Sequence, residues 1–174
     1  MTSFPIRHLA ELNIGRLVAE PGDARVAEFM GALDKINGMG KRMPGFVWMA
    51  EGSGEPGTGN TENHIGDDPQ FVANLTVWED VESLEHFVFN TVHKQFYDRR
   101  EEWFELMADQ HFVMWHVEPG HKPTLDEALE RLAYKQKHGD SDHAFGWSFI
   151  KEARLYMTKA CRPHEPASVQ GAPL

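Results

Sequence analysis

The sequence is poor in cysteine, in long hydrophobic runs and in basic charge. Cys161 is the only cysteine among 174 residues, so no intrachain disulfide can form, and the composition fits a reducing compartment. No stretch approaches the roughly 20 apolar residues of a membrane span, and the N-terminus lacks the basic segment and apolar run of a secretory signal. These absences predict a cytoplasmic protein that does not enter a membrane.

The shortage of basic charge also limits the partners. The formal net charge is −10 at pH 7, whereas a nucleic acid or an anionic membrane requires a basic surface. Walker, Rossmann and serine-hydrolase motifs are absent, and the Gly-rich segment 52–57 does not stand between a strand and a helix as a phosphate loop does. We therefore expect a small molecule or a protein as partner, and no nucleotide cofactor.

The composition that is present describes an ordinary globular protein. Hydrophobic residues make up 41% and charged residues 25% of the chain, which excludes a mostly disordered protein. The length suits one well-packed domain and is short for two. We assign residues 1–150 to this domain and residues 151–174 to a C-terminal tail.

Residues 71–104 hold the most informative pattern. In an extended strand over residues 71–78, Asn74, Thr76 and Trp78 share one face. The apolar positions then switch to the spacing of an amphipathic helix that begins at Val81. Four polar or aromatic residues border the apolar stripe of that helix: His86, His93, Tyr97 and Arg100. A break in the helix near residues 90–91 would turn the side chain of His93 toward the core.

The remaining elements complete a β, α, β, β, α, β order. We expect strands at residues 9–18, 46–50 and 111–117, and a first helix that is capped by Asp23 and ends near Gly38 or Gly40. A further helix over residues 125–137 is capped by Thr124, and a short strand is expected at residues 145–150. This order predicts a ferredoxin-like α+β fold with a four-stranded antiparallel sheet, plus an extra C-terminal helix.

The sheet should have apolar residues on both faces. Val47, Met49, Val77 and Phe112 cannot all lie under the two helices of the split unit, so part of the second face would be exposed in a monomer. Packing two such faces together would bury both. We therefore expect a homodimer formed through the sheets.

Six short segments resemble a bacterial family of uncharacterised function in the dimeric α/β-barrel superfamily, which includes antibiotic-biosynthesis and haem-degrading monooxygenases. The resemblance extends from about residue 9 to residue 149. The matching segments are Leu12-Asn13-Ile14, Gly45-Phe46-Val47-Trp48, Asn74-Leu75-Thr76-Val77-Trp78, Phe87-Val88 with His93, Arg99-Arg100-Glu101-Glu102-Trp103-Phe104 and Pro119-Gly120-His121-Lys122-Pro123.

The resemblance implies a cavity between sheet and helices and an enzyme for a small aromatic or polycyclic metabolite, with oxygenase-like or cyclase-like chemistry. The superfamily places an Asn, a Trp and often a His around that cavity, and Asn13, Trp78 and His93 or His86 match them. In this hypothesis His93 removes a phenolic proton, Asn13 holds an oxygen, Trp78 packs on the ring and Arg100 balances the anion. The residues expected to contact substrate are Asn74, Trp115, Tyr97 and His86.

Two other functions stay open at this point. His93 could be the axial ligand of a haem, or the chain could be a non-catalytic binder whose expected site residues only pack and hold loops. A metal site at His116, Glu118 and His121 is not expected, because His121 lies beyond a Pro-Gly turn and no further ligand is evident.

Overall fold

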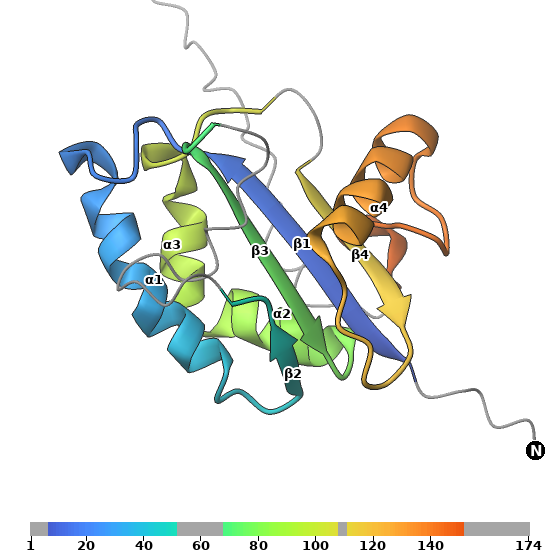
Figure 1. The fold of residues 1–174 in the computed structure, drawn as a ribbon. Coiled ribbons are helices and arrows are strands. Elements are labelled where there is room, and N and C mark those ends of the chain that lie inside the picture. The colour runs from blue at the N-terminus through green and yellow to red at the C-terminus, as the bar shows by residue number, and fades with distance from the viewer. Residues whose placement is uncertain (1–6, 52–67, 108–110, 152–174) are drawn as a thin grey trace, which may run out of the picture.

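The computed structural model describes residues 7–51, 68–107 and 111–151. Its centre is a four-stranded antiparallel sheet in the order β2-β3-β1-β4 (Figure 1). The strands are β1 (His8–Arg16), β2 (Phe46–Met49), β3 (Phe71–Trp78) and β4 (Phe112–Val117). This confirms the ferredoxin-like α+β class, because the two central strands are β1 and β3 and each pairs with an outer strand.

Register assigns every strand residue to one of two faces. Glu11 pairs with Thr76 of β3 and with Met114 of β4, so these three side chains share a face. This face packs against helices α1, α2 and α3, and we call it the helix face. The opposite face, which carries Ala10 and Leu12, packs against α4.

Two aspartates mark the starts of helical segments, because their side chains accept backbone N–H groups, and only the capping by Asp23 was expected. Asp23 caps a 3-10 turn (Ala24–Val26) that leads into α1 (Ala27–Gly40), and Asp80 caps α2 (Val81–Asn90). The helix breaks after residue 90, which the sequence analysis raised only as a condition for turning His93 inward: the Thr91 hydroxyl donates to the Phe87 carbonyl at 2.6 Å and the Thr91 backbone is extended. Helix α3 (His93–Asp98) follows in a new direction (Figure 1).

The helix α4 (Leu125–His138) lies beside β4 (Figure 1). It buries Ala128 and Leu132 against the opposite face of the sheet. The sequence had predicted no helix on this face and had assigned it to a homodimer contact. Two of the residues used to infer a second apolar face lie elsewhere: Met49 pairs with Thr76 and Phe112 pairs with Asn13, both on the helix face. None of the described helices is long and apolar enough to span a membrane.

The last described element differs from the expected short strand. Phe145 exchanges two backbone hydrogen bonds with Met114, at 2.7 and 2.9 Å, and the ladder stops after this single pair. It stops because the next residue that could pair, Trp147, begins a 3-10 turn, while the Gly146 N–H points away from β4 and bonds to the Asp140 carboxylate. A 3-10 turn (Trp147–Phe149) then places the Trp147 ring on Phe112, so the chain folds over the edge of β4.

Candidate functional site

A chain of hydrogen bonds runs across the centre of the helix face from Trp78 to Glu11. The Trp78 indole N–H donates to the Thr76 hydroxyl at 2.9 Å, and that hydroxyl donates to Oε2 of Glu11 at 2.9 Å. An indole N–H can only donate, so the Thr76 oxygen accepts from it and keeps its own proton for Glu11. All three residues are buried, and Glu11 is only 6% exposed.

Burial keeps the Glu11 carboxyl in its neutral form. Loss of hydration raises the pKa of Glu11 from 4.5 to about 8, and the Thr76 hydrogen bond opposes this only in part. No described Lys or Arg side chain forms an ion pair with it. At neutral pH the acid proton therefore resides mainly on Oε1, because Oε2 accepts from Thr76.

Two amide side chains continue this polar row toward the end of β1. Asn13 and Asn74 are cross-strand partners, and Phe112 pairs with Asn13 from the other side. Asn13 is exposed and Asn74 is partly buried. Because alternate residues of a strand share a face, both amides lie on the helix face beside Glu11 and Thr76. The register thus brings together an acid and two amides.

His93 opens α3 and adjoins the same aromatic layer. Its ring lies 4.9 Å from the Phe87 ring, and Phe87 stacks on Trp78 at 5.3 Å. Burial lowers the pKa of His93 from 6.5 to about 4. Nδ1 lies 3.3 Å from the Val88 carbonyl, and a carbonyl can only accept, so Nδ1 carries the proton and Nε2 is the acceptor. At neutral pH His93 is an uncharged and weak base.

Three of the expected residues, in α2, in α3 and in the 3-10 turn after α3 (Arg100–Glu102), lie away from Glu11. His86 is exposed, and its Nδ1 is 3.2 Å from the Asn90 amide. The Arg100 guanidinium is exposed, donates to the Tyr97 carbonyl at 2.9 Å and lies 4.7 Å from the Tyr97 ring centre. Tyr97 is partly buried and packs edge-on against Phe89. Arg100 is therefore held on the helix surface and not over Glu11.

Trp115 is separated from the group by register. It pairs with Ala10 and so points to the opposite face, where its indole N–H donates to Glu127 at 3.0 Å. The other oxygen of Glu127 lies 2.8 Å from Nε2 of His121, so this histidine holds the loop before α4. Among the described residues no three His, Cys, Asp or Glu side chains are close enough to share a metal ion.

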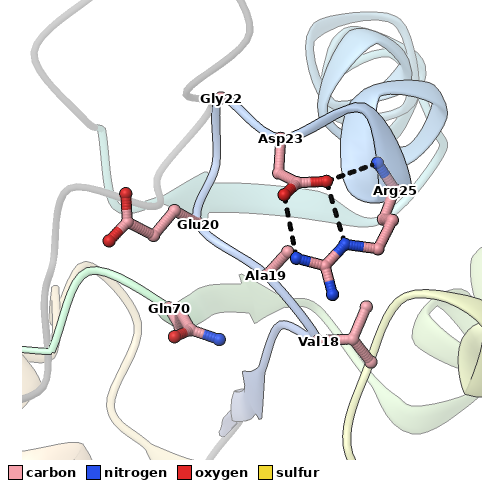
Figure 2. A pocket seen from close by; sticks show the side chains of 7 residues that line it. All are labelled: Val18, Ala19, Glu20, Gly22, Asp23, Arg25 and Gln70. Carbon is pink, nitrogen blue, oxygen red and sulfur yellow. Dashed lines mark hydrogen bonds and ion pairs between the residues drawn. The ribbon is translucent and has the colours of Figure 1, made fainter.

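Cavities of about 470 and 480 Å³ open at two other places in the described chain. Figure 2 shows the first, beside the C-terminal end of β1, where Asp23 and Arg25 face each other. Their two side-chain hydrogen bonds, at 3.0 and 2.8 Å, pair the charges of Asp23 and Arg25 with each other, and the carboxylate of Glu20 also lines this cavity. The second lies at the outer edge of β4 and is considered below.

The sequence analysis did not single out Glu11 or Thr76 as site residues. The signal that could have found Glu11 is its position two residues before Asn13 in an apolar strand, the same alternation that identified Asn74 and Thr76 in β3. The sequence alone does not show which strands lie on each side of β1, and so it does not show that Glu11 faces Thr76.

A family model described as "Domain of unknown function (DUF3291)" matches residues 8–159 of the chain. No curated protein matches the chain. Three solved structures are similar in fold. A conserved protein from Methanosarcina mazei Go1 is 13% identical, with a TM-score of 0.45, over 65% of this chain and 93% of that one. SnoaB, a cofactor-independent oxygenase from Streptomyces nogalater, is 16% identical, with a TM-score of 0.41, over 70% and 99%. PA3566 from Pseudomonas aeruginosa is 15% identical, with a TM-score of 0.42, over 68% and 100%. These distant similarities carry no inference about activity.

Proposed function

The chain belongs to the family described as a domain of unknown function (DUF3291), and we propose from its site that it is an enzyme that transfers a proton to or from a small aromatic molecule. The observation that carries this proposal is the buried Glu11 carboxyl without a cationic partner. An unpaired buried acid destabilises a fold, and a pKa near the working pH is what general acid–base catalysis requires.

In the proposed mechanism Glu11 takes the role that the sequence hypothesis gave to His93. A carboxylate whose conjugate acid has a pKa of about 8 accepts a phenolic or enolic proton more readily than an imidazole with a pKa of about 4. The base is the ionised form of Glu11, which is the minor form at neutral pH and reaches about half at pH 8. In that form the proton moves from the substrate oxygen to the Glu11 carboxylate, and the amides of Asn13 and Asn74 donate to the oxygen anion that remains. That anion then reacts with dioxygen in an oxygenase, or with a carbonyl of the same molecule in a cyclase.

Trp78 and Arg100 act differently from the sequence hypothesis in this proposal. Trp78 is fully buried behind Thr76, so it orients the hydroxyl that holds Glu11 and does not stack on the substrate. Arg100 is held by Tyr97 on the surface, and the amides balance the anion instead. The chemistry then needs no nucleotide cofactor.

The Glu11→Gln variant tests the proposal. With a panel of naphthols and hydroxyanthracenes, we expect turnover in this variant to fall about 10²- to 10⁴-fold, because the amide cannot exchange the proton. Oxygen uptake with this panel measures an oxygenase. A cyclase is measured by chromatographic loss, under nitrogen, of a phenol that also carries a ketone side chain, because ring closure needs a carbonyl in the same molecule. Glu79→Gln, at an exposed position, is the matched control and should keep its activity.

Asn13→Ala separates an enzyme from a plain binder. Asn13 is exposed, so its loss should leave the melting temperature unchanged while it lowers turnover. Full turnover in Glu11→Gln would contradict the proposed role of the acid. Equal substrate binding with no turnover in any variant would favour the non-catalytic binder.

Haem is the alternative cofactor, and the described residues fit it poorly. The His93 tautomer would suit an axial ligand, since Nδ1 is bonded to a carbonyl and Nε2 can accept. However, the ring packs against Phe87, with 4.9 Å between the ring centres, so an aromatic side chain already covers one side of the imidazole. We therefore derive no step through haem.

We also propose that the chain acts as a cytoplasmic homodimer. Helix α4 packs on β4 and β1, whereas Val47, Trp48 and Ala50 beside β3 are only partly buried on the opposite face. A second copy packed there would bury them. We expect light scattering to give the dimer mass for the wild type and the monomer mass for Trp48→Glu; a monomeric wild type would contradict this assembly.

A further inference from the structure

Lys135 is a buried lysine in the last turn of α4, and its ammonium group is only partly satisfied. Its side chain is 8% exposed. Nζ donates to the Phe112 carbonyl at 2.9 Å, while the nearest carboxylate oxygen, Oδ1 of Asp140, is 4.0 Å away and beyond hydrogen-bond distance. An ammonium carries three N–H donors, so two of them have no hydrogen-bond partner among the described residues.

These donors border the cavity of about 480 Å³ at the outer edge of β4. Phe112 and Trp147 also line it, and their rings stack nearly parallel at 5.5 Å. Ser148 lies at the exposed side. The cavity thus combines a mainly polar lining with two aromatic side chains and the buried Lys135 ammonium, groups that can hold and orient a small aromatic ligand.

The charges around Lys135 favour a neutral ligand over an anion. Asp140 already offsets the ammonium, and its two oxygens accept from the Gly146 N–H and the Ser148 hydroxyl. The C-terminal carbonyls of α4 add negative partial charge at the same place. A carboxylate or phosphate would meet this negative charge, whereas the oxygen of a ketone or amide would only accept a hydrogen bond.

We propose that this cavity is a second binding site, separate from Glu11, for a small neutral aromatic carbonyl compound. The carbonyl oxygen accepts from Lys135, and the ring lies against Trp147. Such a ligand satisfies buried N–H donors that have no hydrogen-bond partner within residues 7–51, 68–107 and 111–151. Burial lowers the pKa of Lys135 while Asp140 opposes that shift, which is consistent with an ammonium that gains from an added acceptor.

The experiment compares two probes, acetophenone and benzoate, by saturation-transfer NMR and by titration of the wild type. We expect acetophenone to bind at least tenfold more tightly than benzoate. Lys135→Met should weaken acetophenone binding at least tenfold, because Met keeps the length of the side chain and removes the N–H donors. Lys137→Met, at an exposed position on the same helix, is the matched control and should bind like the wild type.

Two further variants keep the test decisive if Lys135→Met does not fold. A Cβ at Gly146 would lie 3.2 Å from Nζ and 3.3 Å from Cε of Lys135, so Gly146→Ala should displace the ammonium and weaken acetophenone binding. Glu11→Gln should leave it unchanged, which distinguishes this site from the proposed catalytic one. Unchanged affinity in Lys135→Met or Gly146→Ala, or tighter binding of benzoate than of acetophenone, would overturn the proposal.

Discussion

The free energy of unfolding of the wild type should fall by about 1.5 kcal/mol between pH 6.5 and 8 because of Glu11. The pKa of Glu11 is about 8 in the folded chain and 4.5 when the group is solvated. Between these values the folded state holds a proton that the unfolded state has lost, so raising the pH favours unfolding. The stabilisation is complete below pH 4.5 and is lost as the pH rises through 8.

His93 has the opposite effect at lower pH. Its pKa of about 4 lies below the ordinary 6.5, so the folded state gains stability as the pH rises from 4 to 6.5 and nothing thereafter. The effects of Glu11 and His93 on the free energy of unfolding therefore nearly cancel between pH 4.5 and 6.5. Above pH 6.5, of these two groups only Glu11 changes it. The other carboxyls with shifted pKa values, Asp23, Glu28, Asp68 and Glu102, are all lowered and stay ionised throughout.

Urea unfolding at half-unit pH intervals measures this effect. In Glu11→Gln the free energy of unfolding should no longer fall between pH 6.5 and 8. Below pH 6.5 it should rise with pH, because the effect of His93 is then no longer cancelled. Glu79→Gln should follow the wild type. An unchanged pH profile in Glu11→Gln would show that the carboxyl is ionised in the folded chain, and the proposed acid–base role would then be lost as well.

Gly45→Ala should destabilise the fold by about 3 kcal/mol or more. Gly45 has a φ of 77°, and an added Cβ would lie 2.0 Å from Oγ and 2.5 Å from Cβ of Ser83 in the first turn of α2. A left-handed backbone costs about 1–2 kcal/mol in any residue with a Cβ, and the clash adds to it. The turn cannot move away easily, because the Gly45 carbonyl accepts from the Glu79 N–H at 2.8 Å.

A double variant separates the two contributions. Ser83→Gly removes the atoms that the new methyl group meets, so Gly45→Ala with Ser83→Gly should lose less stability than the sum of the single variants. Gly22→Ala is the control, since nothing lies within 4 Å of its added Cβ. Thermal or urea unfolding gives each value, and a Gly45→Ala variant as stable as Gly22→Ala would contradict the assigned geometry.

The sequence predicted those parts of the fold that depend on local chemistry. Asp23, Asp80 and Thr124 cap helices because their side-chain oxygens accept backbone N–H groups, and the capping at Asp23 and Thr124 was expected. Local chemistry also ends α2 at Thr91, whose hydroxyl bonds back to Phe87, although the sequence analysis named a break there only as a condition. Strand β3 begins and ends at the predicted residues, since its alternation is clear.

Local sequence patterns do not determine which residues of neighbouring strands pair, or on which face of the sheet a helix packs. Trp115 was grouped with Asn13 because both lie on strands beside polar residues, but β4 aligns Trp115 with Ala10 on the opposite face. The position of α4 depends on long-range contacts of Ala128 and Leu132, which helical periodicity does not specify. The candidate site in the structure differs from the predicted one for the same reason. Pairing of β1 with β3 puts Thr76 beside Glu11 and buries both.

The place of β1 at the centre of the sheet also bears on how the chain acquires its fold. Glu11 and its partner Thr76 are 65 residues apart in sequence, and β4 follows later still. The first strand therefore cannot pair on either side until much of the chain has been made, and such non-local pairing slows folding. During synthesis its apolar residues remain unpaired near the ribosome, where a chaperone would protect them from aggregation.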